Sequence, residues 1–347
     1  MRTYTLKVIG LKQETVDTLT VVFKQPGLKK IKYKAGQYLT LIIKVNNRRY
    51  IRPYSFSSAP GVEKDLEITV KRVQGGVVSN HILDKVQIGD IIEVIEPMGK
   101  FVLPEEFSIL RPHIVLWGAG SGITPLISIA KYALHAFGTY KVTLVYGNRN
   151  SESVIFADKL AELSRLFPDR LKIWNFHTQL IVEDSNPYVV QGRINPQIVL
   201  DMMNNHEVLT DAFHYICGPI GLKQSVKTEL SKFNIDERLI HSEDFELQID
   251  PEQLSEVRTQ KVIIEKDGIQ NLIEVVKGKS LLEAGLDSSL DLPYSCQTGS
   301  CFICKGRLKG GKVKTISSDE GIADLNEDEL LLCCSFPVSD DVYIISQ

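Results

Sequence analysis

Apolar and polar residues alternate along the first third of the chain, in short runs separated by turn residues. The runs are YTLKVIGLKQ, LTVVFKQPG, YLTLIIKVNN, LEITVKRV and DIIEVIEP. Between them, breaks fall at Pro26-Gly27, Asn46-Asn47, Pro60-Gly61, Gly75-Gly76 and Gly89-Asp90. Alternation with a period of two is typical of strands with one buried face. We therefore predict a small antiparallel β-barrel over residues 1–108.

The pattern changes after this segment, because short continuous apolar runs now alternate with helical stretches. HIVLWG, KVTLVYG and LKIWNF read as buried strands, AFHYICG precedes another helix, and helices are expected at about 125–137 and 155–167. Strands alternating with helices predict a parallel α/β sheet over residues 109–245. Residues 246–260 are polar, contain a proline and lack periodicity, so we predict a linker there. Residues 261–347 open with two strand-like runs and form a third predicted domain.

Composition places the protein in an ordinary globular class. The chain has 347 residues, of which 43% are hydrophobic and 24% charged, which suits two or three folded domains. No apolar run approaches the roughly 18 residues of a membrane span. The first residues alternate and carry charges, unlike a signal peptide. We therefore expect a soluble cytoplasmic protein without an integral membrane segment, in which clustered thiols bind metal more often than they form disulfides.

Charge is unevenly distributed along the chain, although the net value is only −3. Residues 1–110 hold 17 Lys and Arg against 11 Asp and Glu, whereas residues 261–347 hold 9 against 14. No basic block indicates nucleic-acid binding. The basic first third and the acidic last third could attract one another, or they are simply the solvated surfaces of separate domains.

Three cysteines near the end of the chain have a diagnostic spacing. Cys296, Cys301 and Cys304 form C-x4-C-x2-C, and Cys334 follows after 29 intervening residues. This is the plant-type spacing of a 2Fe-2S cluster. The small residues Ser295, Gly299 and Ser300 would let backbone N–H groups approach the sulfides. A zinc site and unligated thiols are the alternatives.

A glycine-rich turn in the middle domain suggests a nucleotide site. Gly118 and Gly120 lie between the strand HIVLWG and the next helix, where backbone N–H groups can meet a pyrophosphate. The acid that a Rossmann NAD site places at the end of the second strand is missing. Arg149 stands there instead and suits a 2′-phosphate, which favours NADPH over NADH. A solvated loop arginine is the alternative.

Hydride carries two electrons and the cluster accepts one, so we expect a flavin between nucleotide and cluster. The barrel contains Arg52-Pro53-Tyr54-Ser55 after a strand, and Gly75-Gly76-Val77-Val78-Ser79 further on. An arginine and hydroxyls can hold a flavin phosphate, and a tyrosine can pack against the ring.

Taken in order, these motifs resemble one known superfamily. RPYS, GGVVS, GAGSGITP and Cys217-Gly218-Pro219 closely resemble the ferredoxin–NADP reductase superfamily over about residues 1–245. Residues 261–347 resemble a plant-type ferredoxin domain, which implies a β-grasp fold. In that family the last ligand follows the third after about 29 residues. This selects Cys334 over its neighbour Cys333.

The resemblance implies roles for individual residues. FAD would contact Arg52, Tyr54, Ser55, Val70, Gly76 and Ser79. The nicotinamide nucleotide would contact Gly118, Gly120, Thr124, Arg149, Gly218 and Pro219. Thr124, Cys217, Glu243 and Phe245 would surround the reacting rings, and Cys296, Cys301, Cys304 and Cys334 would bind the cluster. A buried core thiol at Cys217 and simple packing at Phe245 are the alternatives.

A reductase joined to a C-terminal ferredoxin resembles the reductase components of multicomponent oxygenases. The predicted electron path runs from NADPH, or NADH, through FAD and the 2Fe-2S cluster to a terminal oxygenase or desaturase. Within this group the chain most resembles reductases of phenylacetyl-CoA epoxidase systems. Ketosteroid and ring hydroxylases and acyl desaturases are alternative partners. A general NAD(P)H diaphorase and a redox-sensing module are alternative functions.

Overall fold

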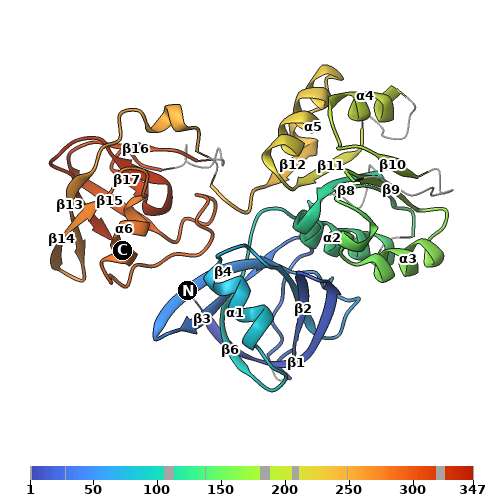
Figure 1. The fold of residues 1–347 in the computed structure, drawn as a ribbon, viewed down its shortest axis with the longest axis horizontal. Coiled ribbons are helices and arrows are strands. Elements are labelled where there is room, and N and C mark those ends of the chain that lie inside the picture. The colour runs from blue at the N-terminus through green and yellow to red at the C-terminus, as the bar shows by residue number, and fades with distance from the viewer. Residues whose placement is uncertain are drawn as a thin grey trace. The chain divides into compact units, whose positions relative to one another are not determined.

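The computed structural model describes residues 2–27, 29–104, 113–136, 138–179, 188–204, 211–247, 249–317 and 325–346. The chain divides into two compact units, Met1–Glu243 and Asp244–Gln347. Figure 1 labels most of their elements, and each unit is described by itself.

The first unit begins with an antiparallel sheet of six strands, in the order β4-β3-β6-β1-β2-β5. An isolated bridge from Phe56 to Ile68 of β5 joins the end of β4 to the other edge strand, so the sheet curls into a barrel. Inward-facing residues such as Val8, Leu39 and Ile68 fill its core. The elements are β1 (Thr3–Thr15), β2 (Thr18–Phe23), β3 (Tyr38–Val45), β4 (Arg48–Ser55), β5 (Leu66–Lys71), α1 (Val77–Lys85) and β6 (Ile91–Met98).

The barrel follows from the alternating pattern of the sequence. Asn46 and Asn47 both have positive φ, 50° and 63°, as a two-residue hairpin turn between β3 and β4 requires. Helix α1 is absent from the prediction, because its nine residues show too little periodicity to separate a helix from a loop.

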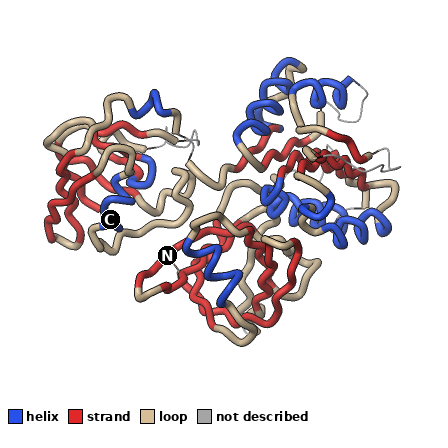
Figure 2. Tube along the Cα trace, viewed as in Figure 1, coloured by secondary structure: helices blue, strands red, loops and turns tan. Residues whose placement is uncertain are grey.

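The second half of this unit is a parallel sheet in the order β10-β9-β8-β7-β11-β12. Figure 2 shows its strands in red between two layers of blue helices. One face packs against α2 and α3 through residues such as Leu116 and Leu144. The other packs against α4 and α5 through Val115, Trp117 and Val145. Strands buried on both faces explain the continuous apolar runs.

The strands of this domain are β7 (His113–Ala119), β8 (Lys141–Asn148), β9 (Leu171–His177), β10 (Val189–Gln191), β11 (Phe213–Cys217) and β12 (Ile240–Glu243). Its helices are α2 (Ile123–Ala136), α3 (Ala157–Leu166), α4 (Pro196–Asn204) and α5 (Ile220–Lys232). Helices α2 and α3 confirm the two predicted helical stretches. Three-residue 3-10 turns at Gly120–Gly122, Ser151–Ser153 and Glu237–Leu239 complete the domain.

Buried polar contacts fasten the barrel to the α/β domain. Ser128 of α2 donates its hydroxyl to the carbonyl of Ser58 at 2.6 Å, and Lys131 of the same helix pairs with Glu63. The Tyr215 hydroxyl of β11 donates to the carbonyl of Val102 at 2.9 Å.

The second unit is a mixed sheet in the order β14-β13-β19-β15-β17, with a small sheet of β16 and β18. Helix α6 packs on it and begins with a capping box between Ser280 and Glu283. This α+β layout confirms the predicted fold class. The elements are β13 (Gln260–Lys266), β14 (Ile269–Val275), α6 (Leu281–Asp287), β15 (Lys305–Gly310), β16 (Val313–Thr315), β17 (Glu329–Leu331), a 3-10 turn (Leu332–Cys334), β18 (Ser335–Pro337) and β19 (Tyr343–Ser346).

The segment predicted as a linker, residues 246–260, is built into this second unit. A 3-10 turn forms at Pro251–Leu254, and Val257 is completely buried against Ile316 and Phe336. Its apolar residues are too irregularly spaced to reveal that packing in the sequence. Among the described helices, none has the length and apolar character needed to cross a membrane.

Candidate functional site

The flavin-side residues predicted on the barrel lie at the end of β4. Arg52 donates from Nη1 to the carbonyl of Ile51 at 2.8 Å. Burial raises the pKa of Tyr54 to about 12, against the opposing charge of Arg52, so its hydroxyl stays protonated and can donate a hydrogen bond. Ser55 is buried, and its hydroxyl lies 3.5 Å from Glu243 Oε2.

The turn before α1 forms a second part of this site. A Cβ on Gly76 would lie 2.8 Å from the Ser79 hydroxyl, so the turn closes tightly against that side chain. Ser79 Oγ in turn accepts a hydrogen bond from the Val73 amide at 3.1 Å. No side chain caps α1, and no acid stands in its first turn. Its free N–H groups therefore fit a pyrophosphate.

Val70 of β5 is more deeply buried than the other flavin-side residues. Its side chain is completely buried in the barrel core, packed with the inward-facing residues of the neighbouring strands. Tyr54 packs against the same cluster of residues. The contact of Val70 with the flavin stays a prediction.

The glycine-rich turn after β7 adopts the shape that a nucleotide site needs. Gly120 has φ of +52°, and no atom lies within 4 Å of the place where its Cβ would be. A Cβ on Gly122 would stand only 2.0 Å from the carbonyl oxygen of Cys217, so this position admits only glycine. Helix α2 follows with no acid in its first turn. The open cradle at Gly120 fits a pyrophosphate.

Thr124 and Cys217 meet at this edge of the sheet. Thr124 is buried and donates its hydroxyl to the carbonyl of Ser121 at 3.0 Å. Cys217, also buried, pairs in register with Gly118 on one side and with Glu243 on the other. Because Glu243 also contacts Ser55, residues from four separate segments converge where barrel and sheet meet. This is the carboxyl edge of a parallel sheet, where such folds bind ligands.

The remaining predicted nucleotide contacts lie on either side of this edge. Gly218 and Pro219 lead from β11 into α5, which begins without an acid in its first turn. Phe245 belongs to the second unit, and its side chain is 45% exposed. Its role beside the flavin stays a prediction.

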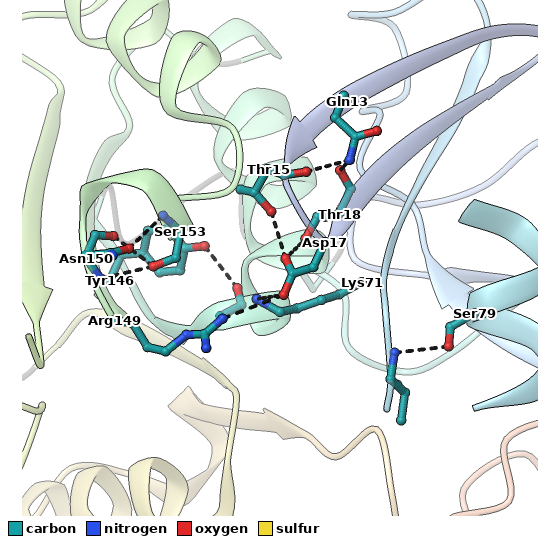
Figure 3. A network of polar contacts seen from close by, with 12 residues as sticks. Gln13, Thr15, Asp17, Thr18, Lys71, Ser79, Tyr146, Arg149, Asn150 and Ser153 are labelled. Atoms are coloured by element: carbon teal, nitrogen blue, oxygen red, sulfur yellow. Dashed lines mark hydrogen bonds and ion pairs between the residues drawn. The ribbon is translucent and has the colours of Figure 1, made fainter. Parts of the chain in front are cut away.

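Arg149, the predicted 2′-phosphate contact, follows β8 and points toward the barrel (Figure 3). Its Nη2 lies 3.7 Å from Asp17 Oδ2 in the turn between β1 and β2. Burial tends to raise the pKa of Asp17, but hydrogen bonds from Thr15, Thr18 and Lys71 and the charge of Lys71 outweigh burial and lower it. Asp17 was not predicted, because it comes from a different domain.

The cysteine loop of the second unit bends around its own thiols. Gln297, Gly299 and Phe302 all have positive φ, between 61° and 89°. Such left-handed residues turn successive amides inward. The amide of Thr298 already donates to Cys296 Sγ at 3.4 Å.

Thiols of this unit shift one another's pKa values. Hydrogen bonds from Cys301 and then Cys333 lower the pKa of Cys296, and the bond from Cys333 lowers the pKa of Cys304. The same bonds raise the pKa of the donors Cys301 and Cys333. The structure therefore brings the thiols of Cys296, Cys301, Cys304 and Cys333 together, and Cys334 also contacts Cys333.

Cys334, the predicted fourth ligand, also lies against this loop. Its thiol donates to the carbonyl of Leu331 at 3.6 Å and lies 3.3 Å from where a Cβ on Gly299 would stand. Cys333, its neighbour in the 3-10 turn Leu332–Cys334, contacts Cys296 and Cys304 as well as Cys334. Both cysteines are therefore placed beside the other three thiols, and Cys334 as the fourth ligand stays a prediction.

These thiols fit a cluster with two irons. In a 2Fe-2S cluster each iron is bound by two of the four cysteines, so a protein that holds one needs two pairs of neighbouring thiols. The contacts of Cys296 with Cys301 and of Cys304 with Cys333 supply two such pairs.

Comparison with known proteins agrees with this layout. The family model of an oxidoreductase FAD-binding domain matches residues 5–103, that of an oxidoreductase NAD-binding domain matches 116–228, and that of a 2Fe-2S iron-sulfur cluster binding domain matches 264–338. The ferredoxin reductase component of 3-ketosteroid-9-alpha-monooxygenase from Mycobacterium tuberculosis is 32% identical over 98% of this chain and 94% of that protein. The chain belongs to this family of oxygenase reductase components.

Two further relatives extend the comparison. A component of 1,2-phenylacetyl-CoA epoxidase from Escherichia coli is 29% identical to the reductase over 98% of the reductase chain and 97% of that component. Phthalate dioxygenase reductase, a modular structure for electron transfer from pyridine nucleotides to a 2Fe-2S centre, shares the fold with a TM-score of 0.69 at 24% identity, covering 99% and 98% of the two chains. The reductase is an oxidoreductase that uses NAD(P)H, FAD and a 2Fe-2S cluster, in that order of electron transfer.

Proposed function

We propose that the reductase takes electrons from NADPH and delivers them to the terminal component of a phenylacetyl-CoA epoxidase-type monooxygenase. The relatives named above are components of oxygenase systems and match over nearly their whole length, which supports an oxygenase as the acceptor. Arg149 supports the choice of NADPH, because it stands where an NAD site has an acid.

The observation that carries the electron path is the convergence at the carboxyl edge of the parallel sheet. Cys217 lies in register with both Gly118 and Glu243, and Glu243 reaches Ser55 on the barrel. When bound, NAD(P)H supplies a hydride, FAD takes two electrons and releases them singly, and the cluster carries one at a time. The protein residues therefore have to position the rings and exclude water.

Each residue of this edge has a proposed task. Thr124 and Cys217 limit the space for the nicotinamide, since both side chains are buried beside the glycine turn. Tyr54 packs on the flavin ring and keeps its hydroxyl protonated. Glu243 Oε2 holds the Ser55 hydroxyl and closes the site on the barrel side. No acid–base pair is needed, because positioning carries the reaction.

We also propose Cys333, with Cys296, Cys301 and Cys304, as the ligand set of the cluster. Support comes from the contacts of its thiol with those of Cys296 and Cys304. A cytoplasmic location fits this proposal, since thiolate ligands persist where thiols stay reduced.

A second candidate acceptor is a ketosteroid monooxygenase. The 32% identity to the ketosteroid reductase component, compared with 29% to the epoxidase component, favours it. Both candidates use the same site, so reconstitution separates them. The purified reductase is mixed with NADPH and either the phenylacetyl-CoA epoxidase oxygenase or the ketosteroid oxygenase, and product is measured.

The epoxidase assignment predicts NADPH-dependent product with the first oxygenase and a much lower rate with the second. The reverse ranking would replace the proposed acceptor. A reductase that reduces dyes but supports neither oxygenase would refute both and favour a diaphorase.

A further inference from the structure

An ion pair connects the two domains of the first unit at the predicted 2′-phosphate position. Arg149 extends from the end of β8, and Asp17 sits in the turn between β1 and β2, with 3.7 Å between Nη2 and Oδ2. Figure 3 shows the two side chains pointing toward one another. The Arg149 side chain is 65% exposed and that of Asp17 only 25%, so the arginine is open to a ligand while the acid is held in the barrel.

Several contacts fix the Asp17 carboxylate. Thr15 and Thr18 donate their hydroxyls to Oδ1 at 2.8 and 3.0 Å, and Lys71 Nζ lies 3.5 Å from Oδ2. The Arg72 amide donates to the Asp17 carbonyl at 2.8 Å. The carboxylate is thus a rigid negative charge beside Arg149, whereas the long arginine side chain can choose its partner.

The position of this acid bears on nucleotide choice. Residues 118–151 contain no Asp or Glu, so the carboxylate that meets Arg149 comes from the other domain. A 2′-phosphate carries two negative charges and has to share Arg149 with Asp17 or displace it. A 2′-hydroxyl has no such conflict, since a carboxylate can accept its hydrogen bond.

We propose that Asp17 is a specificity-determining residue that competes with the 2′-phosphate of NADPH for Arg149. Its charge limits the preference of the reductase for NADPH and keeps binding of NADH comparatively favourable. This inference rests on the proposed function, in which Arg149 meets the 2′-phosphate.

The test compares equilibrium binding of NADP⁺ and NAD⁺ to the oxidised holoprotein by titration calorimetry. Asp17→Asn keeps the side-chain shape and removes the charge. Glu93→Gln, an exposed acid on β6 of the same barrel, removes one charge away from Arg149 and serves as the matched control. Arg149→Gln tests the underlying assignment. Flavin content and melting temperature confirm folding, and Asp17→Ser is a second variant if Asp17→Asn folds poorly.

Loss of an exposed ion-pair competitor is worth up to about fivefold in affinity. Asp17→Asn should therefore lower the Kd for NADP⁺ by up to about fivefold and leave the Kd for NAD⁺ unchanged or higher. Glu93→Gln should change neither Kd. In the Arg149→Gln background, Asp17→Asn should lose most of its effect, because the two residues act on one another.

The possible results distinguish a failure of competition by Asp17 from a failure of the Arg149 assignment. If Arg149→Gln weakens NADP⁺ binding but Asp17→Asn does not strengthen it, competition by Asp17 is refuted while the Arg149 assignment stands. If Asp17→Asn weakens both nucleotides equally, Asp17 only supports the fold and the inference fails. If Arg149→Gln changes neither nucleotide, the proposed 2′-phosphate contact itself is wrong.

Discussion

Replacing Gly122 with alanine should distort the nucleotide side of the site more than adding one methyl group at any other position in this region. Gly122 ends the turn between β7 and α2, directly against the end of β11. An added Cβ would lie 2.0 Å from the Cys217 carbonyl oxygen, 2.5 Å from its carbon and 2.8 Å from the Gly218 amide nitrogen. All three are backbone atoms, so no side-chain rotation can relieve the clash.

The size of the effect follows from that overlap. Ordinary contact begins near 3.4 Å, which leaves the Cβ about 1.4 Å too close to the oxygen. Overpacking of this kind costs about 1–3 kcal/mol. The relief has to come from moving α2 away from the turn at Cys217. A displacement of about 1 Å beside the chemistry can reduce the rate by about a hundredfold.

Gly221→Ala provides the matched control. Gly221 lies in α5, four residues beyond Cys217, with nothing within 4 Å of its would-be Cβ. Alanine there should stabilise the helix by about 0.5–1 kcal/mol. Both variants are compared by urea denaturation and by NADPH-dependent reduction of ferricyanide at matched flavin content, which reports the nucleotide-to-flavin step without the cluster.

We expect a lower unfolding midpoint and a large loss of activity for Gly122→Ala alone. Equal stability and equal activity of the two variants would refute the close approach of the Gly122 turn to Cys217. Loss of stability with unchanged activity would mean that the turn does not shape the nucleotide site.

Two further predictions concern the cluster and the pH dependence of stability. Cys333→Ser should abolish the iron–sulfur absorbance and electron transfer to cytochrome c while ferricyanide reduction persists. Cys334→Ser should retain the iron–sulfur absorbance and electron transfer to cytochrome c. The opposite pattern would show that Cys334 is the ligand. Burial, with His113 and His241 nearby, lowers the pKa of His214 from 6.5 to about 3. Between these values the unfolded chain binds a proton that the native protein does not, so stability should fall as pH falls, by up to about 1.4 kcal/mol per pH unit. His214→Gln keeps an acceptor for the Trp117 indole N–H, 3.2 Å away. In this variant the midpoint of urea unfolding should depend less on pH between pH 4.5 and 7. A slope equal to that of the unmodified protein would contradict the role of His214.

The parts of the fold that were predictable depend on local patterns. Alternating strands and Asn46-Asn47 indicate the hairpins of the barrel, and continuous apolar runs such as HIVLWG indicate a sheet covered on both faces. Local patterns did not predict the packing of residues 246–260, because that packing depends on single apolar residues such as Val257 that contact partners distant in the sequence.

Residues of the candidate site also fall into those predictable from local sequence and those set by distant contacts. Glycine turns after strands have local causes, so Gly76 and Gly120 could be identified by sequence. Asp17 meets Arg149 only through the docking of two domains, and nothing near either residue signals the contact. The choice between Cys333 and Cys334 depends on which side chain of a 3-10 turn faces the loop at Cys296, which a count of intervening residues does not determine.

The most direct test of the electron path is an anaerobic absorbance titration of the purified reductase with NADPH, repeated with NADH. We expect NADPH at low concentration to bleach the flavin and iron–sulfur bands together. A spectrum with flavin but without cluster bands, in protein prepared without oxygen, would contradict the assignment of the cysteines. Cluster bands that stay oxidised while the flavin bleaches would contradict electron transfer from the flavin to the cluster.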